Sequence, residues 1–219
     1  MSRNTLSLRT PGHVGQFLPK DIKNVIINYL LELRNIIKNG GYDEGNILNM
    51  DETPLYLNMV LNKVIAKKGE KNVVVRTQNQ DRIRITCLLT ICADGDKLPP
   101  YIIFKGKNIN NRNMNEIKNN IYFKNKKIFI NFNSNAWSTK EIMIDWIEKI
   151  YFPYIKQDPL CGSALLILDK ASSHVQEEVI EKCSGNLMDI SILPGGTTSI
   201  IKPLDISINK NFKSYIREK

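Results

Sequence analysis

The segment Ala-Leu-Leu-Ile-Leu-Asp, from Ala164 to Asp169, gives the clearest indication of the fold in this chain of 219 residues. An unbroken apolar run of this length is typical of a strand that is buried on both faces of a sheet. A carboxylate at the end of such a strand is costly to bury unless a cation meets it. The segment therefore predicts a central strand whose last residue, Asp169, faces a cation.

Helical and extended patterns alternate on both sides of this strand. Apolar residues at helical spacing predict a helix over 19–39, with Pro19 in its first turn and Gly40-Gly41 at its end. Later helices are predicted from Ser138 or Thr139 to about Pro153, which ends or bends the helix, and over 175–183 and 206–217. Runs rich in β-branched and apolar residues predict strands over 46–51, 64–66, 72–76, 82–93, 100–104, 128–132, 164–169 and 188–193.

This order of elements predicts an α/β fold with a mixed sheet flanked by helices. The strands between residues 46 and 104 favour an antiparallel meander, and the later strands alternate with helices. That order matches the ribonuclease H-like plan, in which acidic residues gather at one edge of two neighbouring strands and a late helix. We expect residues 19–219 to form this domain, and residues 1–18, which are polar, basic and broken by Pro and Gly, to form a linker.

Three aspartates lie where this plan would gather its acidic residues. Asp51 lies in Asn-Met-Asp-Glu-Thr-Pro (residues 49–54), Asp169 ends the central strand, and Asp205 lies in Lys-Pro-Leu-Asp, just where a helix begins. Two Mg²⁺ ions roughly 3.5–4 Å apart are the standard device for cutting and joining phosphodiesters. We therefore predict that Asp51, Asp169 and Asp205 are catalytic and bind metal; the alternative is three unrelated surface aspartates in turns.

Charge and composition narrow the class of protein. The net charge of +9 favours a polyanionic partner such as DNA; the alternative is a lysine excess that serves only solubility. Four scattered cysteines without a Cys-x-x-Cys pair, and two histidines, disfavour a structural zinc site or a disulfide framework. No apolar stretch has the length of a membrane span or a signal peptide, so we expect an intracellular protein without membrane contact.

Four motifs resemble the pogo/Tigger branch of the Tc1/mariner transposase superfamily, whose catalytic part is a DDE superfamily endonuclease domain. They lie at residues 49–54, 93–107, 168–174 and 194–205, and the resemblance extends over nearly the whole chain. It implies an RNase H-like fold and cut-and-paste DNA transposition with Mg²⁺, or with Mn²⁺ in its place. Asp51 would bridge two ions, and Asp169 and Asp205 would each hold one.

The same resemblance implies partners and a location. Transposon ends and target DNA would be the substrates, a homodimer would act on paired ends, and the protein would reside in the nucleus. Relatives place helix-turn-helix modules before the catalytic domain, so residues 1–18 would be the linker that follows a missing DNA-binding module. Two residues depart from the family pattern: Lys170 stands where relatives often carry Asn or Ser, and Lys202 where they often carry Gln. Each adds a cation beside the site, which would weaken metal binding or help to hold phosphate.

These observations allow three hypotheses about the function of the chain. The leading hypothesis is a metal-dependent endonuclease and strand transferase; its rival is a catalytically silent or domesticated DNA-binding descendant. A third reading is an RNase H-like nuclease that acts on RNA–DNA hybrids. Glu52 is either a carboxylate close to the metal site, or a solvated acid in a turn or a salt-bridge partner. His174 either approaches the scissile phosphate or is a hydrogen-bonded structural residue.

Overall fold

The computed structural model describes residues 6–9, 21–56, 64–67, 84–106, 116–117, 125–155, 163–185 and 188–218. The chain forms two compact units, one of Met1–Phe17 with Tyr56–Ile83 and the other of Leu18–Leu55 with Arg84–Lys219. In the first unit, β1 (Leu6–Arg9) pairs antiparallel with β3 (Val64–Lys67). The strand predicted over 72–76 lies outside the described residues.

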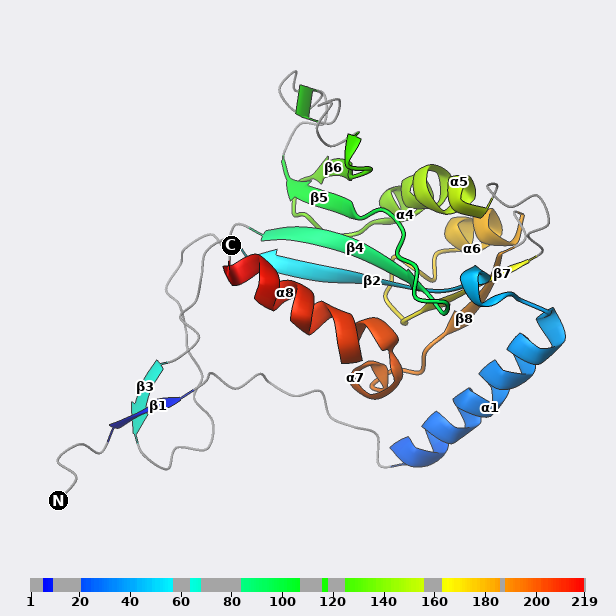
Figure 1. The fold of residues 1–219 in the computed structure, drawn as a ribbon, viewed down its shortest axis with the longest axis horizontal. Helices are drawn as coiled ribbons and strands as arrows, with labels where there is room; N and C mark the ends of the chain where they lie inside the picture. Colours follow the sequence, from blue (N-terminus) through cyan, green and yellow to red (C-terminus); the bar gives the residue numbers. More distant parts are fainter. Residues whose placement is uncertain are drawn as a thin grey trace. The chain divides into compact units, whose positions relative to one another are not determined.

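The second unit is built on a six-stranded mixed sheet with the strand order β6-β5-β4-β2-β7-β8 (Figure 1). The strands are β2 (Ile47–Tyr56), β4 (Arg84–Cys92), β5 (Tyr101–Lys105), β6 (Phe129–Asn133), β7 (Ala164–Leu168) and β8 (Met188–Ile192). β4 and β5 are antiparallel, whereas β7 is parallel to both β2 and β8. The mixed sheet is therefore as predicted, but β6 runs parallel to β5 and does not extend the antiparallel part.

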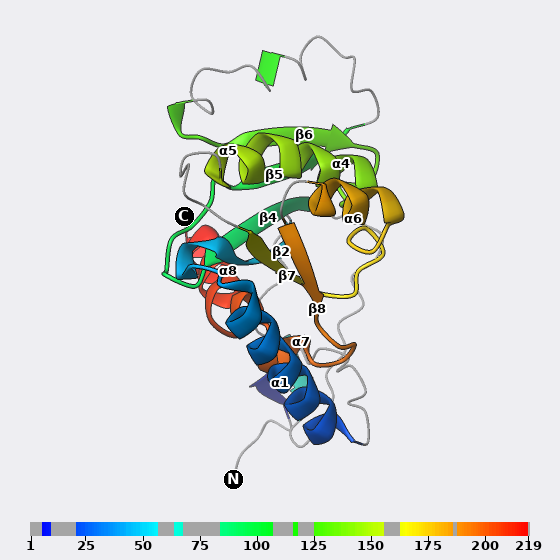
Figure 2. The same cartoon turned by 90° about the vertical axis from the view of Figure 1, so that its right-hand side faces the viewer.

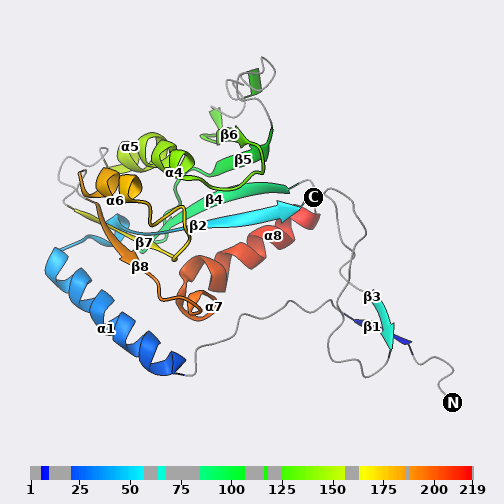
Figure 3. The same ribbon diagram turned by 180° about the vertical axis from the view of Figure 1, so that it is seen from behind.

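Helices cover both faces of this sheet. One face carries α4 (Lys140–Trp146), the π-helical segment η2 (Ile147–Tyr151), α5 (Phe152–Ile155) and α6 (Glu177–Ser184), as Figure 2 shows. The other face carries α1 (Ile22–Gly40), α7 (Thr198–Ile201), the π-helical segment η3 (Leu204–Ile208) and α8 (Asn209–Glu218), which Figure 3 shows from behind. A short 3-10 turn, η1 (Glu44–Asn46), leads from α1 into β2.

Local sequence explains several of the helix ends. Gly41 ends α1 with φ +63°, a left-handed conformation that glycine adopts without steric penalty. Thr139 caps α4, because its side chain accepts a hydrogen bond of 3.5 Å from Ile142 N. Pro153 lies in α5, and residues 156–162 lie outside the described part of the chain, so the helix end near Pro153 stays a prediction.

Two hydrophobic layers hold the sheet between its helices. On one face, the fully buried Trp146 and Tyr151 pack with Leu166 and Leu168 of β7. On the other face, Tyr29 of α1 packs with Leu165 and Ile167 of β7. All five residues of β7 are buried, which confirms the prediction that this strand is central and covered on both faces.

Candidate metal and catalytic site

The three predicted aspartates surround one lysine ammonium. Lys202 Nζ lies 2.5 Å from Asp51 Oδ1, 2.8 Å from Asp169 Oδ2 and 3.6 Å from Asp205 Oδ2. The structure thus brings together side chains that are 118 and 36 residues apart along the chain, at the edge where β7 ends. Their catalytic and metal-binding roles stay predictions, because convergence alone does not establish chemistry.

The sheet and the following helix place these carboxylates. β2 and β7 are parallel neighbours, so Asp51 within β2 and Asp169, directly after β7, lie at adjacent positions on the sheet. Asp205 is the second residue of η3, which covers this edge of the sheet. The Asp51 side chain is 7% exposed, whereas those of Asp169 and Asp205 are 23% and 34% exposed, so the site opens toward solvent on the side of the last two.

Asn49 fixes η3 against the strands. It lies two residues before Asp51 and therefore on the same face of β2. Its Nδ2 donates to Ile167 O of β7 at 2.9 Å, and its Oδ1 accepts from Leu204 N at 3.2 Å. This buried amide thereby ties the start of the Asp205 helix to two strands. The sequence analysis did not identify this role, although the period of the strand would have placed Asn49 beside Asp51.

Asn209 is a second functional residue that the sequence analysis missed. It is buried, and its Nδ2 lies 2.6 Å from Asp51 Oδ2 and 3.0 Å from Asp205 Oδ1. Its Oδ1 is buried and has no hydrogen-bond partner among the described residues. The spacing of four residues from Asp205 is the available signal, because it places both side chains on one side of a helix.

His174 links Asp169 to Glu52. The ring is fully buried, with Nε2 2.9 Å from Glu52 Oε1 and Nδ1 3.0 Å from Asp169 Oδ1. Burial alone would lower the pKa of His174, but the two carboxylates raise it to about 10. Burial alone would raise the pKa of Asp169, but the hydrogen bonds of His174 and Lys202 hold it far below the ordinary value.

His174 is therefore an imidazolium that holds two carboxylates in place. The ligand atoms of Glu52, Asp169 and His174 lie close enough together to hold an ion. A protonated imidazole donates from both nitrogens and offers no lone pair, so a metal ion bound by this group would have to displace the proton of His174. Of the two alternatives for each residue, the structure favours a structural His174 and a salt-bridged Glu52.

The two lysines that depart from the family pattern have different surroundings. Lys170 is exposed, whereas Lys202 is 2% exposed. Burial alone would lower the pKa of Lys202, but Asp51 and Asp169 raise it to about 12, so the ammonium is charged at neutral pH. Burial raises the pKa of Asp51 to about 6, although Lys202 opposes that rise.

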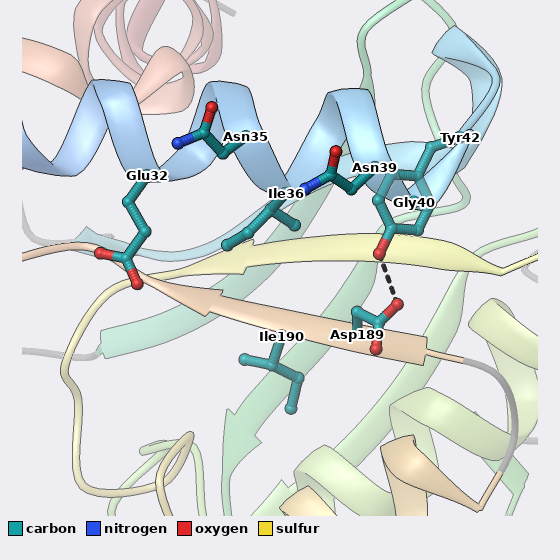
Figure 4. A pocket seen from close by; sticks show the side chains of 8 residues that line it. All are labelled: Glu32, Asn35, Ile36, Asn39, Gly40, Tyr42, Asp189 and Ile190. Carbon is teal, nitrogen blue, oxygen red and sulfur yellow. Dashed lines mark hydrogen bonds between the residues drawn. The ribbon is translucent and has the colours of Figure 1, made fainter.

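Two cavities lie away from this site. A groove of about 740 Å³ runs between α1 and β8, where Tyr42 Oη donates to the Asp189 carboxylate (Figure 4). A second cavity, of about 1020 Å³, is lined by Pro100, Phe129 and several lysines. Neither cavity is lined by an aspartate of the acidic cluster. The Tyr42–Asp189 hydrogen bond links the end of α1 to the sheet.

Comparison with solved structures defines the class of this fold. The catalytic domain of Mos1 mariner transposase matches with a TM-score of 0.51 and 12% identity, over 94% of this chain and 77% of that chain. The Mos1 mariner paired end complex with Mn matches with a TM-score of 0.56 and 11% identity, over 95% of this chain and 54% of that chain. At these identities the likeness shows the fold alone, and it confirms the predicted RNase H-like architecture.

Sequence comparison gives the family. Residues 82–219 match the DDE superfamily endonuclease model, and the chain belongs to this family. A Homo sapiens relative, "Pogo transposable element with KRAB domain", is 30% identical over 220 residues, which are 99% of this chain and 34% of that protein. The predicted pogo-type resemblance is thus confirmed, and the chain spans about a third of that relative's length. None of the helices in the described part of the chain is long and apolar enough to cross a membrane.

Proposed function

We propose that this chain is the catalytic domain of a pogo-like transposase, a divalent-metal-dependent endonuclease and strand transferase that acts on DNA. The observation that carries the proposal is the convergence of three carboxylates, from β2, the end of β7 and η3, around a single nitrogen.

The residues at the site fit a divalent cation such as Mg²⁺ or Mn²⁺. Mg²⁺ prefers oxygen ligands and keeps several waters, so a few carboxylates suffice. The unpartnered, buried Oδ1 of Asn209 is a further oxygen of the kind that such ions accept. Asp51 turns one oxygen toward Asp169 and the other toward Asp205, which suits it to a bridging position.

In this mechanism the protein chiefly places charge and substrate. When bound, the ions would activate a water or a DNA 3′-hydroxyl and stabilise the leaving oxygen. Asp51, Asp169 and Asp205 would hold them. His174 keeps the Asp169 carboxylate ionised and fixed, and Asn49 keeps Asp205 at the strand edge. Both are positioning residues, since neither needs to touch the substrate.

DNA would be the substrate, both as transposon ends and as target. The net charge of +9 supports a polyanionic partner. One Mos1 transposase structure is described as a paired-end complex with the left transposon end, which supports a DNA end as the ligand of this chain. Action as a homodimer on paired ends stays a proposal. We also propose residence in the nucleus, where such DNA lies.

A second candidate function is DNA binding without cleavage. It is favoured by one observation, the ammonium of Lys202 at the centre of the acidic cluster. A cation supplied by the chain would make the carboxylates unavailable to metal. Such a protein would keep the fold and the net positive charge but would not cleave DNA.

Nicking of supercoiled plasmid distinguishes between the two candidate functions. We expect metal-dependent nicking in Mg²⁺ or Mn²⁺ that disappears in Asp169→Asn, while DNA binding by the variant persists. Asp96→Asn is a matched control, because this aspartate is exposed in the segment that follows β4. DNA binding without nicking in either metal would support the second candidate function, a catalytically silent DNA-binding protein. Preferential cutting of an RNA–DNA hybrid would favour an RNase H-like nuclease that acts on such hybrids.

A further inference from the structure

We propose that Lys202 and Asn209 take the places of divalent cations between the three aspartates. They would hold the acidic cluster together without metal, and in the DNA-free wild-type chain Lys202 would limit binding to a single ion. This inference rests on the proposed metal site, and it concerns how that site is occupied and regulated by the chain's own side chains.

The cluster contains two gaps between facing carboxylates, and a nitrogen lies in each. Lys202 Nζ lies between Asp51 Oδ1 and Asp169 Oδ2, at 2.5 Å and 2.8 Å. Asn209 Nδ2 lies between Asp51 Oδ2 and Asp205 Oδ1, at 2.6 Å and 3.0 Å. A pair of bridged metal ions would need these same two gaps, since Asp51 is the carboxylate common to both.

The two nitrogens differ in how easily a cation can replace them. The Asn209 amide has its Oδ1 buried without a partner among the described residues, an arrangement that is unfavourable by itself. Rotation of the amide would exchange Nδ2 for Oδ1 and convert a donor into a ligand. A cation between Asp51 and Asp205 would therefore gain an oxygen and satisfy the buried atom.

Lys202 offers no such exchange. Its side chain is 2% exposed, and its ammonium is charged and contacts all three carboxylates. If it stays in place, a second ion in the Asp51–Asp169 gap meets a positive charge at short range. If it leaves, a buried group must find a new position. In both cases Lys202 opposes an ion in the gap between Asp51 and Asp169. An ion in the gap between Asp51 and Asp205 meets only the amide of Asn209.

Binding of Mn²⁺ to the full chain tests this inference. We expect one weak Mn²⁺ per wild-type chain by isothermal titration, and two in Lys202→Gln, with an affinity at least about tenfold higher because a competing charge is gone. Electron paramagnetic resonance should show coupled Mn²⁺ ions only in Lys202→Gln. In EDTA this variant should melt at a lower temperature than wild type, and Mn²⁺ should raise its melting temperature more than that of wild type.

Two further variants separate the contributions. Lys202→Arg keeps the charge and should bind one Mn²⁺ weakly, like wild type. Asn209→Ala removes the expected ligand oxygen and should weaken the wild-type Mn²⁺ site about tenfold. It keeps Lys202, so it tests the inference even if Lys202→Gln does not fold.

The outcomes also separate the inference from the proposed function. Equal Mn²⁺ affinity and stoichiometry in wild type and Lys202→Gln, or unchanged binding in Asn209→Ala, would overturn the inference and leave the metal-dependent function standing. Absence of Mn²⁺ binding in every folded variant would overturn both.

Discussion

His174 is a buried charge whose contribution to stability depends on pH. The pKa of His174 is raised from 6.5 to about 10 in the folded chain by Asp169 and Glu52, against the opposing effect of burial. A raised pKa means that the stabilisation is complete below about pH 6.5 and is lost as the pH rises through about 10. In EDTA, the difference in unfolding free energy between wild type and His174→Gln should therefore shrink steadily over this range.

Urea unfolding at several pH values measures this difference. Removal of the imidazolium leaves two carboxylates without their buried partner, and we expect a loss of about 3–5 kcal/mol near pH 6. His13, which lies in the same chain outside the described residues, provides the control substitution His13→Gln. A difference that stays constant from pH 6 to about pH 10 would contradict a charged His174.

The acidic residues could be predicted from sequence, but their companions could not. Asp169 directly follows β7 and Asp205 is the second residue of η3, whereas Asp51 lies within β2, which continues to Tyr56 beyond the strand predicted over 46–51. The motifs of all three match a known pattern. Asn49 and Asn209 resemble many other asparagines in an Asn-rich chain, and their roles depend on contacts with Leu204 and Asp51 that are 155 and 158 residues away in sequence. Local patterns do not reveal contacts of that range.

At the scale of elements, η3 needs a firm anchor because it carries Asp205. Leu204 is fully buried, whereas Ile206, two residues later, is 55% exposed. Leu204→Ala should lower the unfolding free energy by about 2–5 kcal/mol, since it leaves a cavity beneath the helix. Ile206→Ala is the matched control and should change it by less than about 0.5 kcal/mol.

A second measurement shows whether this anchor also positions the site. Mn²⁺ affinity should fall in Leu204→Ala even under conditions where the variant is fully folded, because Asp205 would no longer be held beside Asp51. Unchanged Mn²⁺ binding together with a large loss of stability would mean that η3 is held by Asn49 alone. A stable Leu204→Ala would contradict the packing itself.

Elements with strong periodicity were predicted well, and those set by tertiary contacts were not. β7 is a continuous apolar run and lies where its pattern indicates, and α1 shows helical spacing and a glycine end. The π-helical segments η2 and η3 leave no local signal, because a helix with one wider turn shows nearly the same apolar spacing. The parallel pairing of β5 with β6 depends on a connection that the sequence does not specify.

The segment that connects two neighbouring strands of the sheet belongs to the other compact unit. β2 and β4 lie side by side in the sheet, yet the segment Tyr56–Ile83 between them groups with Met1–Phe17 in the smaller unit. The main-chain bond of 2.9 Å from Ala93 N to Ile47 O places the end of β4 beside the start of β2, so the two strands suit a hairpin connection. The sequence analysis assigned residues 19–219 to one domain, and that boundary stays a prediction.

Net charge acts on the scale of the whole molecule, so DNA binding should be largely electrostatic. A chain with a net charge of +9 releases counterions when it neutralises DNA phosphates, and the logarithm of its affinity should fall linearly with the logarithm of salt concentration. Even two neutralised phosphates would lower the affinity about tenfold between roughly 50 and 200 mM salt. Fluorescence anisotropy with a labelled duplex measures this slope in EDTA. Asp169→Asn should keep the wild-type slope, because a carboxylate does not neutralise DNA phosphates. A slope near zero would show that the positive charge serves solubility alone, and the proposed DNA-directed function would then lose its electrostatic support.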